Sequence, residues 1–212
     1  MASKRKRTRT TSSNATAVFK KSGTYVPAAS YKKVVKFAEN KYKDSDVGTY
    51  APSSTGIVYC VSDVSQQTGI QNRIGNMIWG EKLLLNYAVL WDPAVSPGAS
   101  CSVYVIQDMQ VEQNTVPGMA DIFDFYSQGN EFLNISNLGR FKILFQKEHY
   151  CDTAVKTVKF RTQIKLNFPI RYYGTGGTDN QKNSIYVCAR GNYASTGQPA
   201  VQFNTRLLFN DS

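Results

Sequence analysis

The sequence contains a single histidine, His149, among its 212 residues, and only 19 % of its residues carry a charge. A metal centre built from histidines needs several of them, and a serine or cysteine nucleophile needs a histidine as its base. Cys151, two residues after His149, is the nearest such nucleophile in sequence. Residues at this spacing on a strand share a face whether or not they act together, so the pair is no evidence for catalysis. We therefore expect no enzyme, no metal and no cofactor.

The sequence also has no apolar run of eighteen residues, which excludes a transmembrane helix and predicts no membrane insertion. Its start carries the charges of Lys4–Arg7, but the polar residues 8–14 follow where a secretory signal would be apolar. We therefore expect a cytosolic or nuclear protein.

Patterns that bind metals are missing as well. The four cysteines form neither a CxxC pair nor a Cys/His cluster, so we expect free, mostly buried thiols in a reducing compartment. Three aspartates flank residues 110–139 and offer the oxygens that calcium prefers, but their spacing matches no calcium loop. We expect solvated loop carboxylates. The four cysteines are Cys60, Cys101, Cys151 and Cys188, and the three aspartates are Asp108, Asp121 and Asp124.

The net charge of +10 is concentrated at the start of the chain. Residues 1–43 hold twelve lysines and arginines against one acid, Glu39, whereas residues 44–212 hold thirteen against fourteen. Residues 1–30 also contain few bulky apolar side chains, which predicts disorder. We interpret residues 1–38 as a basic arm and residues 39–212 as a globular domain.

The arm is the candidate site for nucleic acid. Flexible cations displace the counterions of phosphates and bind a polyanion strongly at any base sequence. The first basic cluster, Lys4–Arg7, also fits a nuclear import signal. A solubilising tail is the alternative, and three cations on one strand face (Lys159, Arg161, Lys165) extend the polyanion surface or are plain solvated residues. The candidate arm residues are Lys4, Arg5, Lys6, Arg7, Arg9, Lys20, Lys21, Lys32, Lys33 and Lys36.

From residue 56 onward the sequence alternates apolar and polar residues with a period of two, which predicts antiparallel strands. The segment at 101–109 is apolar on both faces at its centre. A short strand near 132–135 would bring the number of strands to eight. The seven other predicted strands cover 57–63, 83–91, 101–109, 141–146, 158–168, 185–189 and 201–209.

Helix is predicted in only two places. Residues 30–46 fit a helix or an extended segment equally, and a solvated basic linker is a third possibility. Met119, Ile122, Phe123 and Tyr126 have helical spacing inside the long segment 110–139. Eight strands with long excursions predict an all-β fold, a single eight-stranded antiparallel jelly roll of two four-stranded sheets.

Five motifs, in this order behind a basic arm, resemble a known family. They are Glu39–Asp44 (ENKYKD), Gln67–Ile78 (QTGIQNRIGNMI), Arg140–Phe145 (RFKILF), Lys182–Val187 (KNSIYV) and Arg206–Asp211 (RLLFND). The chain resembles the capsid proteins of small circular single-stranded DNA viruses that encode a replication initiator (the circovirus-like group). It is similar also to the coat proteins of the satellite necrosis viruses, which package RNA. The arm contains lysine and threonine in place of the long arginine runs of circoviruses proper.

This resemblance implies a strand at Glu39–Asp44 and a structural role. About sixty copies would form a small icosahedral (T=1) shell, with the arms inward on a single-stranded genome, DNA favoured over RNA. Loops would face outward toward an unknown cell receptor or vector, and host import receptors would carry the protein into the nucleus. The protein would then reside in the virion and, before assembly, in the host nucleus and cytoplasm.

Two other functions remain open from the sequence. A stand-alone nucleic-acid-binding β-domain would carry the same arm without forming a shell. A jelly-roll enzyme or lectin would need a cluster of histidines or a convergent polar pocket, and it would have no need of the arm.

Overall fold

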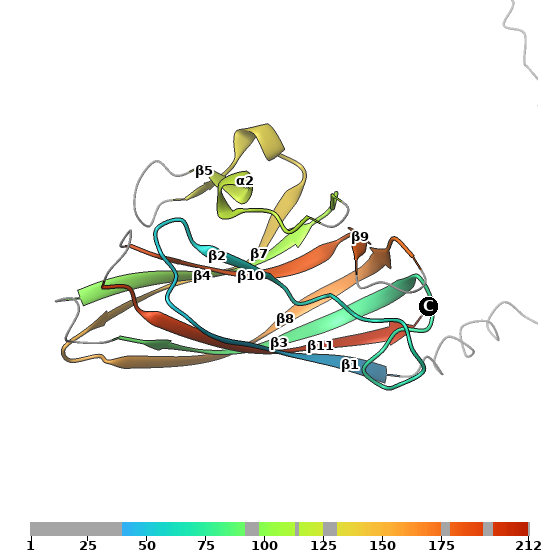
Figure 1. Ribbon diagram of the computed structural model, residues 1–212, viewed down its shortest axis with the longest axis horizontal. Coiled ribbons are helices and arrows are strands. Elements are labelled where there is room, and N and C mark those ends of the chain that lie inside the picture. Colours follow the sequence, from blue (N-terminus) through green and yellow to red (C-terminus); the bar gives the residue numbers. More distant parts are fainter. Residues whose placement is uncertain are drawn as a thin grey trace, which may run out of the picture. The chain divides into compact units, whose positions relative to one another are not determined.

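The computed structural model of the chain describes residues 40–91, 98–112, 115–124, 131–174, 179–192 and 197–211. All of these residues belong to one unit, Ala38–Ser212. They form two antiparallel sheets that pack face to face (Figure 1). The described residues of segment 110–139, called the insertion below, lie on the outer side of one sheet. The arm residues predicted to bind nucleic acid lie outside the described residues.

Nine strands make up the two sheets. The first sheet has the order β1-β11-β3-β8-β9 and the second has the order β2-β10-β4-β7. The strands of the first sheet are β1 (Asn40–Tyr50), β11 (Ala200–Asp211), β3 (Met77–Leu90), β8 (Thr157–Tyr172) and β9 (Asn180–Lys182). Those of the second are β2 (Ile57–Cys60), β10 (Ser184–Gly191), β4 (Gly98–Asp108) and β7 (Phe141–Asp152).

The strand order is that of a jelly roll. Without the short β9 and the strands of the insertion, eight strands remain, and in chain order the two sheets read 1-8-3-6 and 2-7-4-5. Strands distant in sequence therefore alternate within each sheet, as in two interlocked Greek keys. The predicted all-β antiparallel jelly roll is confirmed.

Two details of the strand prediction were wrong. The segment near 132–135 is not the eighth strand of the sandwich, because β6 (Phe132–Leu133) pairs only with β5 (Phe123–Asp124) outside both sheets. The eighth strand is β1, in the segment whose spacing fitted helix and strand equally. Its backbone pairs with β11 from Asn40 to Tyr50, and this long ladder outweighs the weak local helical preference. The first sheet also gains a fifth strand, β9.

The main core lies between the two sheets. Alternate residues of β3 point into it, and β11 and β8 contribute their own inward rows, as the period of two predicted. The buried side chains of these rows include Leu83, Leu85, Tyr87, Val89, Val201, Phe203, Leu207, Phe209, Ile164 and Leu166.

Within the described ranges, helix is confined to the insertion. The helix α2 (Met119–Ile122) is a single turn, shorter than the helix that the spacing predicted, because β5 already begins at Phe123. A 3-10 turn follows at Ile135–Asn137. Tyr126 lies outside the described residues. No helix in the described part of the chain is long and apolar enough to span a bilayer.

Candidate nucleic-acid interface

The outer face of the second sheet is covered by the chain itself over β10 and β4, whereas β7 keeps exposed outward residues (Figure 1). Residues of the insertion pack on β10 and β4 and form a second apolar core, in which the ring centroids of Phe123 and Tyr104 lie 4.7 Å apart. The other buried members of this core are Ile106, Met119, Ile122, Phe141, Tyr186 and Cys188. Because β4 and β10 are covered on both faces, nearly all of their residues are buried.

Ion pairs hold the insertion to the same sheet. Arg140 reaches the buried carboxylate of Asp108 at 3.0 Å and also pairs with Glu112. Hydrogen bonds from Arg140 to Asp108 raise the pKa of the guanidinium. Glu131 pairs with Arg190 of β10 and accepts a 2.6 Å hydrogen bond from the hydroxyl of Tyr104. The insertion is therefore a fixed cover.

The outer face of the first sheet has no such cover among the described residues (Figure 1). Its outward charged side chains are mainly basic, beside polar residues and a few apolar ones such as Leu84 and Trp79. Strand register places these residues on one surface, since residues opposite one another on neighbouring strands share a face. The cations on this face are Lys82, Lys159, Arg161, Lys165, Arg171, Lys182 and Arg206. The acids are Asp44, Asp46 and Glu81. We call this surface the open face.

The cations of β8 stand out on the open face because they lack acidic neighbours. Lys159, Arg161, Lys165 and Arg171 are exposed, and none of them pairs with a carboxylate among the residues that the structure describes. Lys82 of β3 lies directly opposite Lys165 in the register. Like charges directly opposite one another on neighbouring strands repel, so this lysine pair does not stabilise the sheet.

The acids of the open face are already engaged. The carboxylate of Asp44 accepts two hydrogen bonds from Arg206, at 2.6 and 2.8 Å, which hold the pKa of Asp44 below its usual value. Asp46 accepts from the amide of Gly48 at the bulge of β1, and Glu81 accepts from the side chain of Asn210. The positive charge without a described ion pair thus lies on β8, Lys82 and Lys182.

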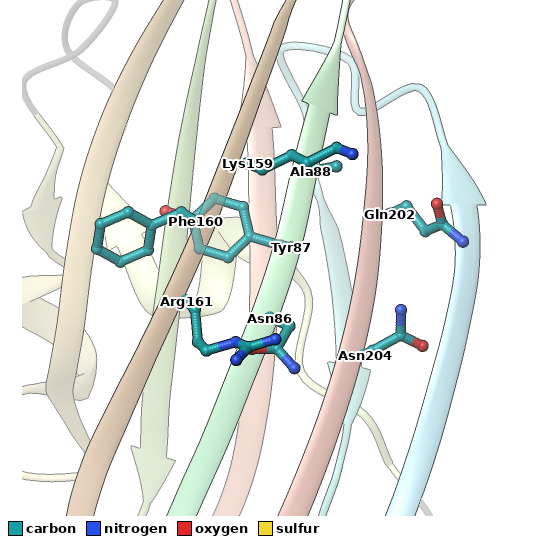
Figure 2. Close-up of a pocket in the computed structure, with 8 residues that line it drawn as sticks. All are labelled: Asn86, Tyr87, Ala88, Lys159, Phe160, Arg161, Gln202 and Asn204. Atoms are coloured by element: carbon teal, nitrogen blue, oxygen red, sulfur yellow. The ribbon is translucent and has the colours of Figure 1, made fainter.

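A hollow of about 290 Å³ lies in the open face over β11, β3 and β8. Two rows of side chains cross the three strands there (Figure 2). One row is Gln202, Ala88 and Lys159, and the other is Asn204, Asn86 and Arg161. Amides therefore lie on one side, cations on the other, and the small Ala88 between them.

The geometry of the hollow is partly fixed. Arg161 donates a 2.9 Å hydrogen bond from Nε to Oδ1 of Asn86, which orients its guanidinium across the strand (Figure 2). The side chains of Gln202 and Asn204 make no hydrogen bond to any described residue. Their donors and acceptors face outward. A second hollow shares Asn86 and Asn204 and continues toward Asp44 and Arg206.

The structure sorts the other cations that the sequence grouped together. Lys159, Arg161 and Lys165 do share one exposed sheet face, as the alternation predicted. Lys41, counted within the basic start of the chain, is instead buried, 2.7 Å from Asp211, and donates to the carbonyl of Asn72. Lys41 therefore holds β1 against the end of β11 and is not available to a polyanion.

Several residues of the open face were not predicted. Lys82, Asn86 and Ala88 lie on the outward side of β3. The sequence signal for this is the alternation with Leu83 and Leu85, which point inward. The pairing of strands that brings them beside β8 and β11 joins residues more than seventy positions apart. No spacing within the sequence encodes that proximity.

The three aspartates considered for calcium each have a protein partner. Asp108 is bound to Arg140, Asp121 accepts from the amide of Gly118, and Asp124 accepts from the amide of Ile135. Asp108 is buried, so the expectation of a solvated carboxylate was wrong there, whereas Asp121 is exposed and Asp124 is half-buried. Across the part of the chain that the structure describes, no group of three or more His, Cys, Asp or Glu side chains could hold a metal ion.

The single histidine is part of the core. His149 lies in β7 and is 7 % exposed, and its Nε2 is joined to the Tyr87 hydroxyl by a 2.6 Å hydrogen bond across the two sheets. Burial, and then the charge of Lys147, lowers the pKa of His149. Burial also raises the pKa of the Cys151 thiol, which disfavours the thiolate that a nucleophile requires.

Comparison with known proteins adds little to these observations. No protein-family model matches the chain, and no curated protein matches it. Among solved structures, the chain is similar to one described as Desmodium yellow mottle tymovirus, with 6 % identity and a TM-score of 0.35. The match covers 81 % of this chain and 86 % of that one. The assignment of the fold therefore rests on the strand order of this chain.

Proposed function

We propose that this chain is a viral capsid protein, a structural protein that assembles into an icosahedral (T=1) shell of about sixty copies around a single-stranded genome. A jelly roll serves capsids, lectins and enzymes alike, so the fold alone does not decide. The observation that carries the proposal is the placement of positive charge. The surplus lies at the start of the chain, and the unpaired cations of the sandwich line one bare face.

Both sets of cations serve the same task in this proposal. Residues 1–38 neutralise phosphates without a fixed structure, and the open face adds a rigid basic surface. The chain enters the first sheet at Asn40, directly after the basic arm residues in sequence. Resemblance favours circular single-stranded DNA as the genome, with Lys4–Arg7 as the import signal and outward loops as the contact to a host cell.

Self-assembly is supported by apolar side chains that the chain leaves uncovered. Phe132, Ile135 and Leu138 are 69 %, 70 % and 65 % exposed, and they lie within seven residues of one another on the insertion. Clustered exposed apolar residues mark protein contact surfaces. A second copy of the chain is the partner that a shell provides.

The proposal is tested by the size and content of the purified full-length protein. We expect size-exclusion chromatography with light scattering to give a particle of about sixty subunits. Its ratio of absorbance at 260 and 280 nm should reveal nuclease-sensitive nucleic acid. A monomer or trimer that binds oligonucleotides only at low salt would contradict the shell and favour the stand-alone binding domain.

A charge placed in the insertion tests the subunit contact separately. Ile135→Asp should leave the sandwich folded, since Ile135 is exposed, and should reduce particle yield at least about tenfold by placing a charge in an apolar contact. Ser136→Asp adds the same charge to the same turn without removing an apolar side chain. Equal particle yields for the two variants would contradict the contact.

A further inference from the structure

We infer that the hollow between β11, β3 and β8 seats one nucleotide of single-stranded nucleic acid, with its phosphate over Lys159 and Arg161 and its base against the amides of β11. This inference deepens the proposed function, because the bound strand would be the packaged genome. It goes further by naming a fixed site on the sandwich in addition to the basic arm.

The side toward β8 suits a phosphate. Lys159 and Arg161 are exposed, neighbours on one face of one strand, and unpaired with any described carboxylate. Arg161 is already oriented by Asn86, so part of the entropy that a flexible cation would lose on binding is lost beforehand. Two neighbouring cations, one of them held in place by Asn86, attract an anion, and neither pairs with a described carboxylate.

The side toward β11 suits a base. Gln202 and Asn204 each present an amide with donors and an acceptor, and no described residue occupies those groups. An amide can pair with the edge of any unpaired base, because each base edge carries donors, acceptors or both. Ala88 lies between the amides and the cations, and its small side chain leaves the space in which a base or sugar could rest.

The arrangement combines two features that suit single-stranded nucleic acid. The cations suit its phosphate, and the row of unpaired amides beside them suits the hydrogen-bonding edge of a base. A duplex presents its base edges inside grooves, whereas a single strand can lay a base flat or edge-on against a sheet. Trp79, 42 % exposed, lies farther along β3 on the same open face and offers a stacking surface for a base several nucleotides away on the same strand of nucleic acid.

Ultraviolet cross-linking of the full-length protein with the nucleic acid it carries locates the contact. We expect cross-linked peptides from residues 82–88, 159–165 and 202–206, in addition to the arm. Peptides of the insertion serve as the internal control and should remain unmodified. Cross-links confined to residues 1–38 would overturn the inference.

Binding of oligothymidylate, about twenty nucleotides long, by unassembled full-length subunits separates charge from shape. The double variant Lys159→Gln/Arg161→Gln should lower the slope of log K against log salt by about 0.7, the change expected when one phosphate contact on a single strand is lost. Lys142→Gln/Lys156→Gln makes the same charge change at exposed sites away from the hollow and should change the slope much less.

Filling the hollow with a larger side chain should affect oligothymidylate binding differently from removing its positive charge. Ala88→Leu should weaken binding at least about fivefold at an unchanged salt slope, because it removes space for the base but no charge. Ala200→Leu, at another outward position of the same face, is its control. Equal affinities for these two variants would overturn the seated base, and an unchanged slope for the Lys159/Arg161 variant would overturn the phosphate contact.

The outcomes distinguish this inference from the proposed function. A nucleic-acid-filled particle with no cross-link in the hollow overturns the inference and leaves the capsid. A protein that never assembles, but cross-links at the hollow, does the opposite. Loss of particles in the Lys159/Arg161 variant, with oligothymidylate binding intact, would show that the open face contacts a second copy and not nucleic acid.

Discussion

The two sheets of this sandwich share one core but differ on their outer faces. The second sheet is covered by the insertion, with an apolar layer and buried ion pairs between them. The first sheet turns outward a row of unpaired cations and amides. Among the described residues, the chain thus covers much of one outer face and leaves the other open.

The difference is written in the strands themselves. β10 is buried along its whole length because it has neighbours on both faces, whereas β8 alternates between buried and exposed residues. A strand with two covered faces needs apolar residues in both phases, and a strand with one covered face needs them in one. The cations of β8 occupy the phase that folding leaves free, so they are available for binding.

The largest effect is expected where both sheets depend on one core. Leu166 of β8 is 7 % exposed and points between the sheets. Leu166→Asp should abolish folding, because the carboxylate would be buried without a partner. Circular dichroism and solubility measure the outcome. Gln163→Asp, on the exposed phase of the same strand, should fold, and a soluble, folded Leu166→Asp protein would contradict the strand register.

The second effect separates the two outer faces. Phe123 of the insertion is almost fully buried in the second apolar core, and Phe123→Ala should lower the free energy of unfolding by about 3 kcal/mol. Trp79→Ala on the open face should cost less than Phe123→Ala, because Trp79 is 42 % exposed and Phe123 is almost fully buried. Urea titration measures both. Equal losses would mean that the open face is as tightly packed as the covered one.

The third effect concerns the hydrogen bond between the sheets. The pKa of His149 is lowered in the folded protein, so between its usual value and the lowered one only the unfolded chain binds the proton. Stability should therefore fall as pH falls below about 6.5, and His149→Gln should lose this part of the pH dependence. Nuclear magnetic resonance follows the single histidine directly. A variant whose stability falls in parallel with the parent would contradict this account.

The smallest effect lies on the open face itself. Lys82 of β3 lies opposite Lys165 of β8, and their repulsion should lower the free energy of unfolding by about 0.3 kcal/mol. Lys82→Gln should stabilise the protein by that amount, with no further gain from Lys165→Gln, and the gain should shrink at high salt. Denaturation at two salt concentrations measures it. A loss of stability would show that these lysines have protein partners.

The main elements of the fold could be predicted from local patterns. The alternation over Val158–Phe168 placed β8 and its exposed cations correctly, and the doubly apolar Cys101–Met109 marked a strand covered on both faces. β1 could not be assigned from spacing, because its identity as a strand comes from the ladder with β11, some 160 residues away. The hollow escaped prediction for the same reason, since Asn86, Arg161 and Asn204 meet only through strand pairing.

Burial of polar groups was the other source of error. Lys41 and Asp108 appear in the sequence as ordinary charged residues, yet each is nearly fully buried in an ion pair. A burial penalty of several kcal/mol for each charge is offset only by partners distant in sequence. Such pairs leave no local signal.

A density map of the purified particle by electron microscopy tests the central claim most directly. The account predicts a shell in which the first sheet faces the interior, with nucleic-acid density over Lys159 and Arg161 and the insertion turned away from the lumen. A shell whose second sheet and insertion face the nucleic acid, with the open face toward solvent, would contradict it.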